Sequence, residues 1–269
     1  MSPDSTSLDA LLAPLCQDPA GAAVLTDVDG TIAPIVGDPA AASVPDEARA
    51  ALAAIAACFA VVACVSGRAA ADAKRLVGLD ELTYIGNHGL ERLEPGSTEA
   101  RSLTALAGHE RAAADFVSRL DAERIAAAGL RTEDKGPISA LHWRGAANED
   151  AAEAIAAEIG ADAGRAGLRT HLGRKVLELR PPVDFDKGIA IAEMLRGGAV
   201  RSALYAGDDH TDLDGFRVLR ELVASGELEA AVCVGIASSE SPAAVTESAD
   251  IVLPGPPAFV AVLEALAAS

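Results

Sequence analysis

Apolar and polar positions alternate along the chain in blocks that predict strands and helices in turn. Short continuous apolar runs, each followed by polar residues typical of turns, predict buried strands. These runs lie at 22–27, 59–65, 83–86, 202–206, 230–234 and 250–253. Apolar residues at helical spacing predict helices over 7–16, 45–57, 187–196 and 257–267. Strands that alternate with helices in this way predict an α/β protein with a parallel, Rossmann-like sheet.

The middle of the chain follows a different pattern. Helices are predicted over 108–127 and 148–160, and strands over 137–144, 168–172 and 175–180, the last two joined by a turn at Gly173-Arg174. A helix, two strands, a helix and two strands would form a small α+β unit (αββαββ) that interrupts the parallel sheet. We therefore predict a core domain with an inserted cap domain, divided as core 1–106, cap 107–181 and core 182–269.

The charge of the chain limits the class of partner. Its 269 residues carry a formal net charge of −18, from 40 acidic and 22 basic side chains. Nucleic acids and anionic membranes both favour basic surfaces, so we expect neither as a partner. An anionic substrate would be repelled at long range, so its site would need local cations.

Cysteine usage and hydropathy indicate the compartment. The four cysteines lie in or beside apolar stretches without zinc-ligand spacing, which is typical of thiols in a reducing compartment. No apolar run reaches membrane-spanning length, and the N-terminus lacks the pattern of a signal peptide. We therefore expect a cytoplasmic protein, and we take it to be a monomer that binds a small molecule.

The first predicted strand ends in two carboxylates. Asp27 and Asp29 are two residues apart, so they share one face of the strand and can point into one pocket. Two carboxylates this close repel each other. The pair therefore requires a divalent cation, a shared proton, or both.

Other predicted strands are followed by polar groups as well. These groups are Ser66, Asn87, His88, Asp208, Asp209 and Asp212, and Lys187 opens a later helix. In an open parallel sheet the carboxyl ends of the strands meet at one edge, where ligands bind. Carboxylates, a hydroxyl and an ammonium group at one edge suit phosphoryl transfer, and hard oxygen ligands favour Mg²⁺. Each group alone is more often a helix cap or a solvated surface residue than part of a functional site, and it is their order and their positions at strand ends that favour the functional interpretation.

The order of these motifs resembles that of a known superfamily. Asp27-Val28-Asp29-Gly30-Thr31, Ser66, Lys187 and Gly207-Asp208-Asp209 are similar to the four motifs of the haloacid-dehalogenase-like (HAD) phosphohydrolases. A narrower similarity, to the trehalose-6-phosphate phosphatases, is carried by residues 65–68, 86–89, 173–181, 186–188 and 207–212. The resemblance implies an HAD core with an inserted cap, and a Mg²⁺-dependent phosphatase that hydrolyses trehalose 6-phosphate.

The resemblance also implies roles for individual residues. Asp27 would be the nucleophile that becomes an aspartyl phosphate, and Asp29 would protonate the leaving oxygen and then activate water. Ser66 and Lys187 would bind the phosphoryl oxygens. Mg²⁺ would be bound by Asp27, the carbonyl oxygen of Asp29, Asp208 and Asp209. Asp209 and Asp212 are also candidates for holding a metal-bound water or orienting Lys187.

The same resemblance implies which residues recognise the sugar. The candidates are Arg68, Asn87, His88, Lys175 and Glu178. Lys175 and Glu178 are three residues apart on a predicted strand. A regular strand would place them on opposite faces, unless it is irregular near Gly173.

Other functions remain open from the sequence. The substrate could be sucrose phosphate, a mannosyl phosphoglycerate or a monosaccharide phosphate, and a phosphomutase would use the same aspartyl phosphate. A non-catalytic HAD-like regulatory domain is a further alternative. Degenerate domains of that kind should lack the nucleophile, whereas Asp27, Asp29 and Lys187 are all present here.

Overall fold

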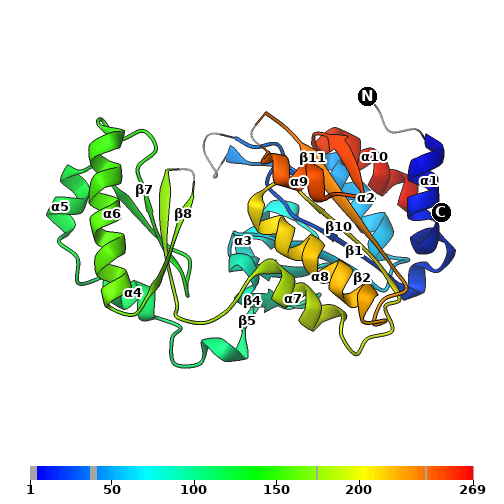
Figure 1. Cartoon of the computed structure of the whole chain (residues 1–269), viewed down its shortest axis with the longest axis horizontal. Coiled ribbons are helices and arrows are strands. Elements are labelled where there is room, and N and C mark those ends of the chain that lie inside the picture. Colours follow the sequence, from blue (N-terminus) through cyan, green and yellow to red (C-terminus); the bar gives the residue numbers. More distant parts are fainter. Residues whose placement is uncertain (1–4, 37–40, 174, 240, 269) are drawn as a thin grey trace. The chain divides into compact units, whose positions relative to one another are not determined.

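The computed structural model describes residues 5–36, 41–173, 175–239 and 241–268 (Figure 1). The chain divides into two units, of which the first comprises Met1–Arg101 and Phe185–Ser269 and the second Ser102–Asp184. The second unit therefore interrupts the first in sequence. This division agrees with the predicted class, an α/β fold with an α+β insertion.

Eight strands form the large sheet, in the order β12-β11-β10-β1-β2-β3-β4-β5. Their bounds are β1 Ala22–Thr26, β2 Val61–Val65, β3 Thr83–Gly86, β4 Glu91–Leu93, β5 Arg101–Ser102, β10 Ser202–Gly207, β11 Ala230–Ala237 and β12 Ile251–Pro254. All pairings from β12 to β3 are parallel, whereas β4 runs antiparallel to β3. The later strands extend the sheet on the opposite side of β1 from β2, so β1 and β10 meet at a topological switch point, where ligands of such sheets bind.

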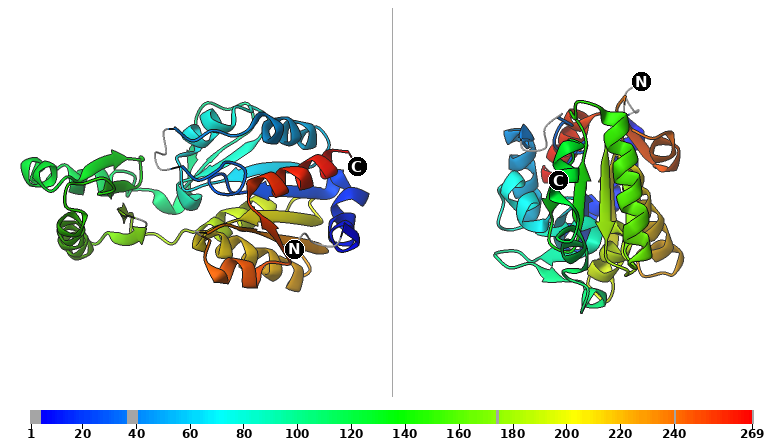
Figure 2. Two further views of the ribbon diagram at one scale, coloured as in Figure 1. Left: turned by 90° about the horizontal axis from the view of Figure 1, so that it is seen from above. Right: turned by 90° about the vertical axis from the view of Figure 1, so that its left-hand side faces the viewer.

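Helices cover both faces of this sheet (Figure 2). One layer consists of α1 Ser5–Gln17, α2 Asp46–Ala56, α3 Ala70–Val77 and α10 Pro256–Ala267. The other consists of α7 Lys187–Leu195, α8 Leu213–Ala224 and α9 Ala243–Ser248. Since both faces are covered, the central strands are mostly apolar, and every residue of β1 is buried. The strands predicted from continuous apolar runs are confirmed.

The second unit contains a four-stranded antiparallel sheet in the order β6-β7-β9-β8. Its elements are α4 Ala112–Val117, α5 Ala122–Ala127, β6 Arg131–Asp134, β7 Ser139–His142, α6 Glu149–Arg165, β8 Arg169–Gly173 and β9 Val176–Arg180. The core of this unit joins the helices to one face of the sheet through Leu141, Trp143, Leu177 and Leu179. No helix of the described residues is both long enough and apolar enough to cross a membrane.

Some of the predictions for individual elements were wrong. The single helix expected over 108–127 is two helices, α4 and α5. Asp121 accepts hydrogen bonds from the amides of Glu123 and Arg124 and is therefore the N-cap residue of a second helix, α5. Strand β6 is the fourth strand that the αββαββ pattern requires, but no residues were assigned to it, because its residues are all polar and exposed and show no alternation. The short β4 and α9 were not predicted. Of the expected turn at Gly173-Arg174, Arg174 lies outside the described residues.

Candidate active site

The carboxyl ends of β1 and β10 bring acidic side chains together. Asp27 directly follows β1, and its amide donates to the carbonyl of Ala206 at 2.8 Å, which extends the pairing with β10. Asp208 directly follows β10, and Asp212 ends the short helix η5 His210–Asp212. One carboxylate oxygen each from Asp27, Asp208 and Asp212 lies within 4.8 Å of the others, and all three residues are buried. We call these three residues the acidic cluster.

Lys187 is a buried cation in contact with this cluster. It is the first residue of α7, whose N-cap Asp186 accepts a hydrogen bond from the amide of Ile189 at 2.6 Å. Its Nζ donates to Oδ1 of Asp27 and to Oδ1 of Asp212, at 2.7 Å each, and its side chain is only 3% exposed. Burial acts to lower the pKa of Lys187, but the two carboxylates outweigh burial and raise it. The ammonium group therefore stays charged.

Asp212 is the most strongly held member of the cluster. Besides Lys187, its Oδ1 accepts from the hydroxyl of Tyr205 at 2.5 Å. Its Oδ2 accepts from the amides of Asp208 and Asp209, at 2.9 Å each. These donors fix its carboxylate, so Asp212 in turn fixes the ammonium group of Lys187 beside Asp27.

If Asp27, Asp208 and Asp212 all ionise, the acidic cluster holds more negative charge than Lys187 can neutralise. Burial raises the pKa of Asp27 well above its ordinary value; Lys187 opposes this, and the neighbouring carboxylates add to it. Burial, together with Asp212, raises the pKa of Asp208 to about 7. A divalent cation would allow these carboxylates to ionise together.

The donor set fits Mg²⁺. Carboxylate oxygens are the hard ligands that this ion prefers. Gly30 has a φ of +87°, and a Cβ there would lie 2.2 Å from Oδ2 of Asp208, so glycine leaves room for that carboxylate. Of the predicted ligands, Asp27 and Asp208 belong to the cluster. The carboxylate of Asp209 instead accepts from the amide of His210 at 2.7 Å, as the cap of η5.

Asp29 faces the turn that follows β2. Arg68 donates through Nε and Nη2 to the two carboxylate oxygens of Asp29, at 2.6 and 2.7 Å. These hydrogen bonds raise the pKa of Arg68, although burial opposes them. Ser66 is buried directly after β2, and its Oγ accepts from the amide of Arg68 at 3.1 Å. The turn thus brings a hydroxyl and a guanidinium group to the end of β1.

Asn87 and His88 support that turn from the neighbouring strand end. They lie in η3 Asn87–Gly89, directly after β3, with left-handed φ values of +50° and +57°. The amide of Asn87 donates to the carbonyl of Arg68 at 2.7 Å, and that of His88 to the carbonyl of Ser66 at 3.1 Å. A Cβ on Gly67 would lie 2.7 Å from Cε1 of His88, so the imidazole packs directly on the glycine.

The other predicted site residues lie in the second unit. Glu178, on β9, is buried and accepts from Nζ of Lys135 at 3.1 Å and from Nη2 of Arg180 at 2.7 Å. Lys175 precedes β9, has a left-handed φ of +60° and forms an ion pair with Glu149. The backbone is therefore irregular at Lys175, and strand parity does not force Lys175 and Glu178 onto opposite faces.

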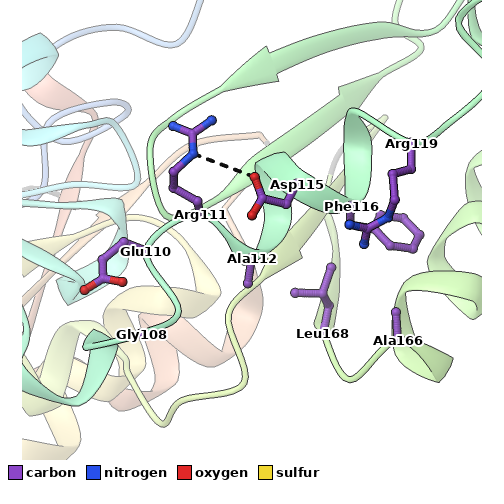
Figure 3. Close-up of a pocket in the computed structure, with 9 residues that line it drawn as sticks. All are labelled: Gly108, Glu110, Arg111, Ala112, Asp115, Phe116, Arg119, Ala166 and Leu168. Carbon is purple, nitrogen blue, oxygen red and sulfur yellow. Dashed lines mark ion pairs between the residues drawn. The ribbon is translucent and has the colours of Figure 1, made fainter.

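The second unit also contains a cavity of about 540 Å³ (Figure 3). It is lined by Gly108, Glu110, Arg111, Ala112, Asp115, Phe116, Arg119, Ala166 and Leu168. Nε of Arg111 lies 3.7 Å from Oδ1 of Asp115, so part of the charge on its wall is paired. None of the residues predicted for catalysis or binding lines this cavity.

Two hydroxyl groups that contact the acidic cluster were missed from the sequence. Tyr205 lies on β10 and donates to Asp212, and the hydroxyl of Thr31 lies 3.4 Å from Oδ1 of Asp208. The signal for Tyr205 was its phenol in an otherwise apolar strand, because a buried hydroxyl requires a partner. Thr31 is part of the Asp27–Thr31 motif, but its sequence position does not show which acid its hydroxyl meets.

The fold of this chain is similar to that of haloacid dehalogenase-like (HAD) proteins of known structure. A haloacid dehalogenase-like hydrolase from Bacteroides thetaiotaomicron has the same fold, with a TM-score of 0.64, 13% identity and coverage of 91% of this chain and 98% of that one. The C-terminal domain of a C. albicans trehalose-6-phosphate phosphatase matches with a TM-score of 0.78 and 21% identity, over 97% of each chain. These similarities establish the fold.

The sequence defines the family within this class. Residues 25–249 match the trehalose-phosphatase family model, and the chain belongs to that family. The trehalose-phosphate phosphatase of Mycobacterium marinum is 38% identical over 163 residues, which are 58% of this chain and 40% of that protein. The chain thus spans less than half the length of this curated relative. The resemblance inferred from the motifs is confirmed.

Proposed function

We propose that the chain is a Mg²⁺-dependent phosphatase that hydrolyses trehalose 6-phosphate to trehalose and inorganic phosphate. Its membership of the trehalose-phosphatase family supports this substrate. The observation that carries the proposal is the buried 2.7 Å contact between Nζ of Lys187 and Oδ1 of Asp27, beside Asp208. It provides a carboxylate nucleophile and a fixed cation at one point of the sheet edge.

In the first step, the carboxylate of Asp27 attacks phosphorus and the bond from phosphorus to the sugar oxygen breaks. Asp29 gives a proton to that leaving oxygen, so trehalose departs and an aspartyl phosphate remains. Lys187 and the hydroxyl of Ser66 bind the phosphoryl oxygens while charge develops on them. The two hydrogen bonds from Arg68 to Asp29 must break before Asp29 can protonate the leaving oxygen.

In the second step, a water molecule attacks the phosphorus of the aspartyl phosphate. Asp29 takes a proton from this water, the acyl phosphate bond breaks, and inorganic phosphate leaves. Asp27 returns as a carboxylate, and Asp29 is protonated again for the next cycle. The atoms and protons therefore balance over the two steps without a further reactant.

The residues that would hold Mg²⁺ are Asp27, Asp208 and the carbonyl oxygen of Asp29. When bound, Mg²⁺ supplies positive charge that neutralises the phosphoryl oxygens and the acidic cluster. Asp212 keeps Lys187 oriented, because it holds Nζ at 2.7 Å while itself accepting from Tyr205. Asp209 would hold a water molecule that is bound to the Mg²⁺.

Recognition of the sugar is assigned to polar and charged residues. A disaccharide presents many hydroxyl groups, which carboxylates and cations bind through charge-assisted hydrogen bonds. Glu178 and Lys175 of the second unit are proposed for this role, with Arg68, Asn87 and His88 of the first. We also propose a cytoplasmic monomer.

Phosphate release from a panel of phosphorylated sugars tests this function directly. The panel contains trehalose 6-phosphate, sucrose phosphate, mannosyl phosphoglycerate and glucose 6-phosphate, each with Mg²⁺ and with the metal chelated. We expect trehalose 6-phosphate to have the highest kcat/KM, and chelation to abolish its turnover. Preference for another sugar phosphate would overturn the substrate, and full turnover without a divalent cation would overturn the metal.

A further inference from the structure

Glu91 joins two segments that adjoin the candidate site. It lies on β4, and its Oε1 accepts from the amide of Ala70 at 2.6 Å and from Nδ2 of Asn87 at 3.1 Å. Ala70 begins α3, and Asn87 begins the left-handed turn after β3. A single carboxylate oxygen therefore connects two elements that are not adjacent in sequence.

The first connection caps α3. The N-cap residue of this helix is Ala69, which has no side-chain oxygen to offer, so the amide of Ala70 has no acceptor on the N-cap side chain. Glu91 supplies that acceptor from the neighbouring strand, and its carboxylate also suits the positive end of the helix. The turn of Ser66 to Arg68 runs directly into this helix, so capping α3 fixes where the turn ends.

The second connection holds the left-handed turn. Asn87 has a φ of +50°, and its own amide donates to the carbonyl of Arg68 at 2.7 Å. Because Glu91 holds the side chain of Asn87, it also fixes the amide that holds Arg68. Gly86 shows how tightly these segments fit, since a Cβ there would lie 2.2 Å from the amide nitrogen of Ala70 and 2.8 Å from Oε1 of Glu91.

We propose that Glu91 is a positioning residue, which holds the Ser66–Arg68 turn so that Ser66 can bind a phosphoryl group and Arg68 can meet Asp29. This inference rests on the proposed function, because it assigns the turn to phosphate binding. Glu91 acts through Ala70 and Asn87 and does not touch the reacting atoms. Displacement of a binding group by about 1 Å costs on the order of 100-fold in rate, so a small shift of the turn has a measurable effect.

Two substitutions separate the position of the oxygen from its charge. Glu91→Gln keeps an acceptor oxygen at the same reach and removes the charge, whereas Glu91→Asp keeps the charge and withdraws it by one methylene group. Burial raises the pKa of Glu91, although its hydrogen bond with Ala70 opposes this. We expect the neutral amide to be tolerated, because it keeps an acceptor oxygen for the amide of Ala70. Asp46→Ala is the matched control, because Asp46 is an exposed acid in the first turn of α2 whose ion pair is with Arg49.

The experiment measures the binding of inorganic phosphate by calorimetry in Mg²⁺, the kcat and KM for p-nitrophenyl phosphate, and thermal unfolding. We expect Glu91→Asp to weaken phosphate binding and lower kcat by about tenfold or more. Glu91→Gln and the control should stay within about threefold of wild type for both quantities. A role in positioning requires that Glu91→Gln keeps phosphate binding and kcat, whereas Glu91→Asp loses them.

The inference is overturned if Glu91→Asp binds phosphate as tightly as wild type, even if its melting temperature falls. It is also overturned if Gln loses as much phosphate binding as Asp. If Glu91→Asp does not fold, Asn87→Asp tests the hydrogen bond between Asn87 and Glu91, because it replaces the donor Nδ2 by an acceptor oxygen. Unchanged phosphate binding by Asn87→Asp would then overturn the inference. Hydrolysis of the aryl phosphate without hydrolysis of trehalose 6-phosphate would remove only the proposed substrate.

Discussion

At the scale of single residues, burial determines the chemistry of the acidic cluster. Asp27, Asp208 and Asp212 are ordinary acids, but their placement at two strand ends and in the short helix η5 removes them from water beside one lysine. The pKa values of Asp27 and Asp208 rise, chiefly through burial, so the cluster favours binding of a cation. That is the condition under which a carboxylate can approach a phosphate ester.

Removal of the nucleophile should abolish turnover without unfolding the protein. Asp27→Asn keeps the shape of the side chain but cannot form an acyl phosphate, so we expect phosphatase activity to fall by on the order of 10⁴- to 10⁶-fold. Its melting temperature should not decrease, because a buried, crowded charge is removed. Asp46→Asn, an exposed acid in α2, should keep full activity. Phosphate release and thermal unfolding measure both effects, and near-wild-type turnover by Asp27→Asn would refute the role.

A buried thiol should make stability fall at high pH. Burial, with Asp250 adding to it, raises the pKa of Cys233 from 9.0 to about 12, so the folded state keeps a proton that the unfolded state loses. The contribution of the Cys233 thiol to the free energy of unfolding is complete below pH 9.0. It is lost as the pH rises toward 12, by up to about 1.4 kcal/mol per pH unit. Denaturant unfolding from pH 8 to about 11 should show a shallower loss for Cys233→Ala than for wild type.

The exposed Cys58 provides the control for this measurement. Cys58→Ala should lose stability with pH as steeply as wild type does. Equal slopes in wild type, Cys58→Ala and Cys233→Ala would show that Cys233 does not contribute. A lower overall stability of Cys233→Ala does not affect the test, because the slope is compared.

The sequence could name the residues of the cluster but not their contacts. Asp208, Asp209 and Asp212 lie within one turn, and their spacing alone does not show which carboxylate faces Asp27. The backbone decides this: Asp209 caps η5, while Asp212 accepts from two amides of the same turn and reaches Lys187. Lys187 is 160 residues from Asp27, so only the fold brings them into contact.

At the scale of elements, prediction succeeded where burial leaves a pattern. The parallel strands lie between two helix layers, so their apolar runs appear in the sequence as continuous blocks. Strand β6 leaves no such pattern, because it is an exposed edge strand of Arg131, Thr132, Glu133 and Asp134. The break between α4 and α5 depends on one cap, Asp121, within a stretch that otherwise has helical spacing.

The cap of α6 provides a test of how the second unit is held together. Asn148 is the N-cap residue and accepts from the amide of Ala151 at 3.0 Å, so Asn148→Ala should lower the free energy of unfolding by about 1 kcal/mol. Trp143 is the only tryptophan and lies in the core of the second unit, so its fluorescence reports on that unit. Glu153→Ala, exposed within α6, should change little. Equal effects of the two substitutions would contradict the capping role.

At the scale of the whole molecule, a net charge of −18 must be reconciled with the anionic substrate that we propose. Two cations place positive charge at the candidate site: Lys187 contacts Asp27, and Arg68 contacts Asp29. A bound divalent cation would add to them, because the acidic cluster retains excess negative charge.

Mg²⁺ should therefore stabilise the folded protein. At a concentration of 100 times its dissociation constant, Mg²⁺ would add about 2.7 kcal/mol to the free energy of unfolding. We expect the melting temperature to rise with Mg²⁺ and to return on chelation, and Asp208→Asn to lose most of this rise. Asp46→Asn should respond as wild type does. An equal rise in Asp208→Asn would place the stabilising ion elsewhere.

Substrate preference tests the assignment of Glu178 to sugar recognition. Glu178→Ala should lower kcat/KM for trehalose 6-phosphate by about tenfold or more, with a much smaller effect on p-nitrophenyl phosphate, because only the disaccharide presents hydroxyl groups to this carboxylate. Glu133→Ala, on the exposed strand β6 of the same sheet, is the matched control. Equal losses on both substrates would remove Glu178 from sugar recognition.

The central claim is that Asp27 attacks the phosphorus of trehalose 6-phosphate. Acid quenching of the reaction with radiolabelled substrate, followed by peptide mapping, tests it most directly. We predict that the label appears on the peptide that contains Asp27 during turnover, and that Asp27→Asn carries none. Undiminished phosphate release by Asp27→Asn, with no label on that peptide in the wild type, would contradict the account.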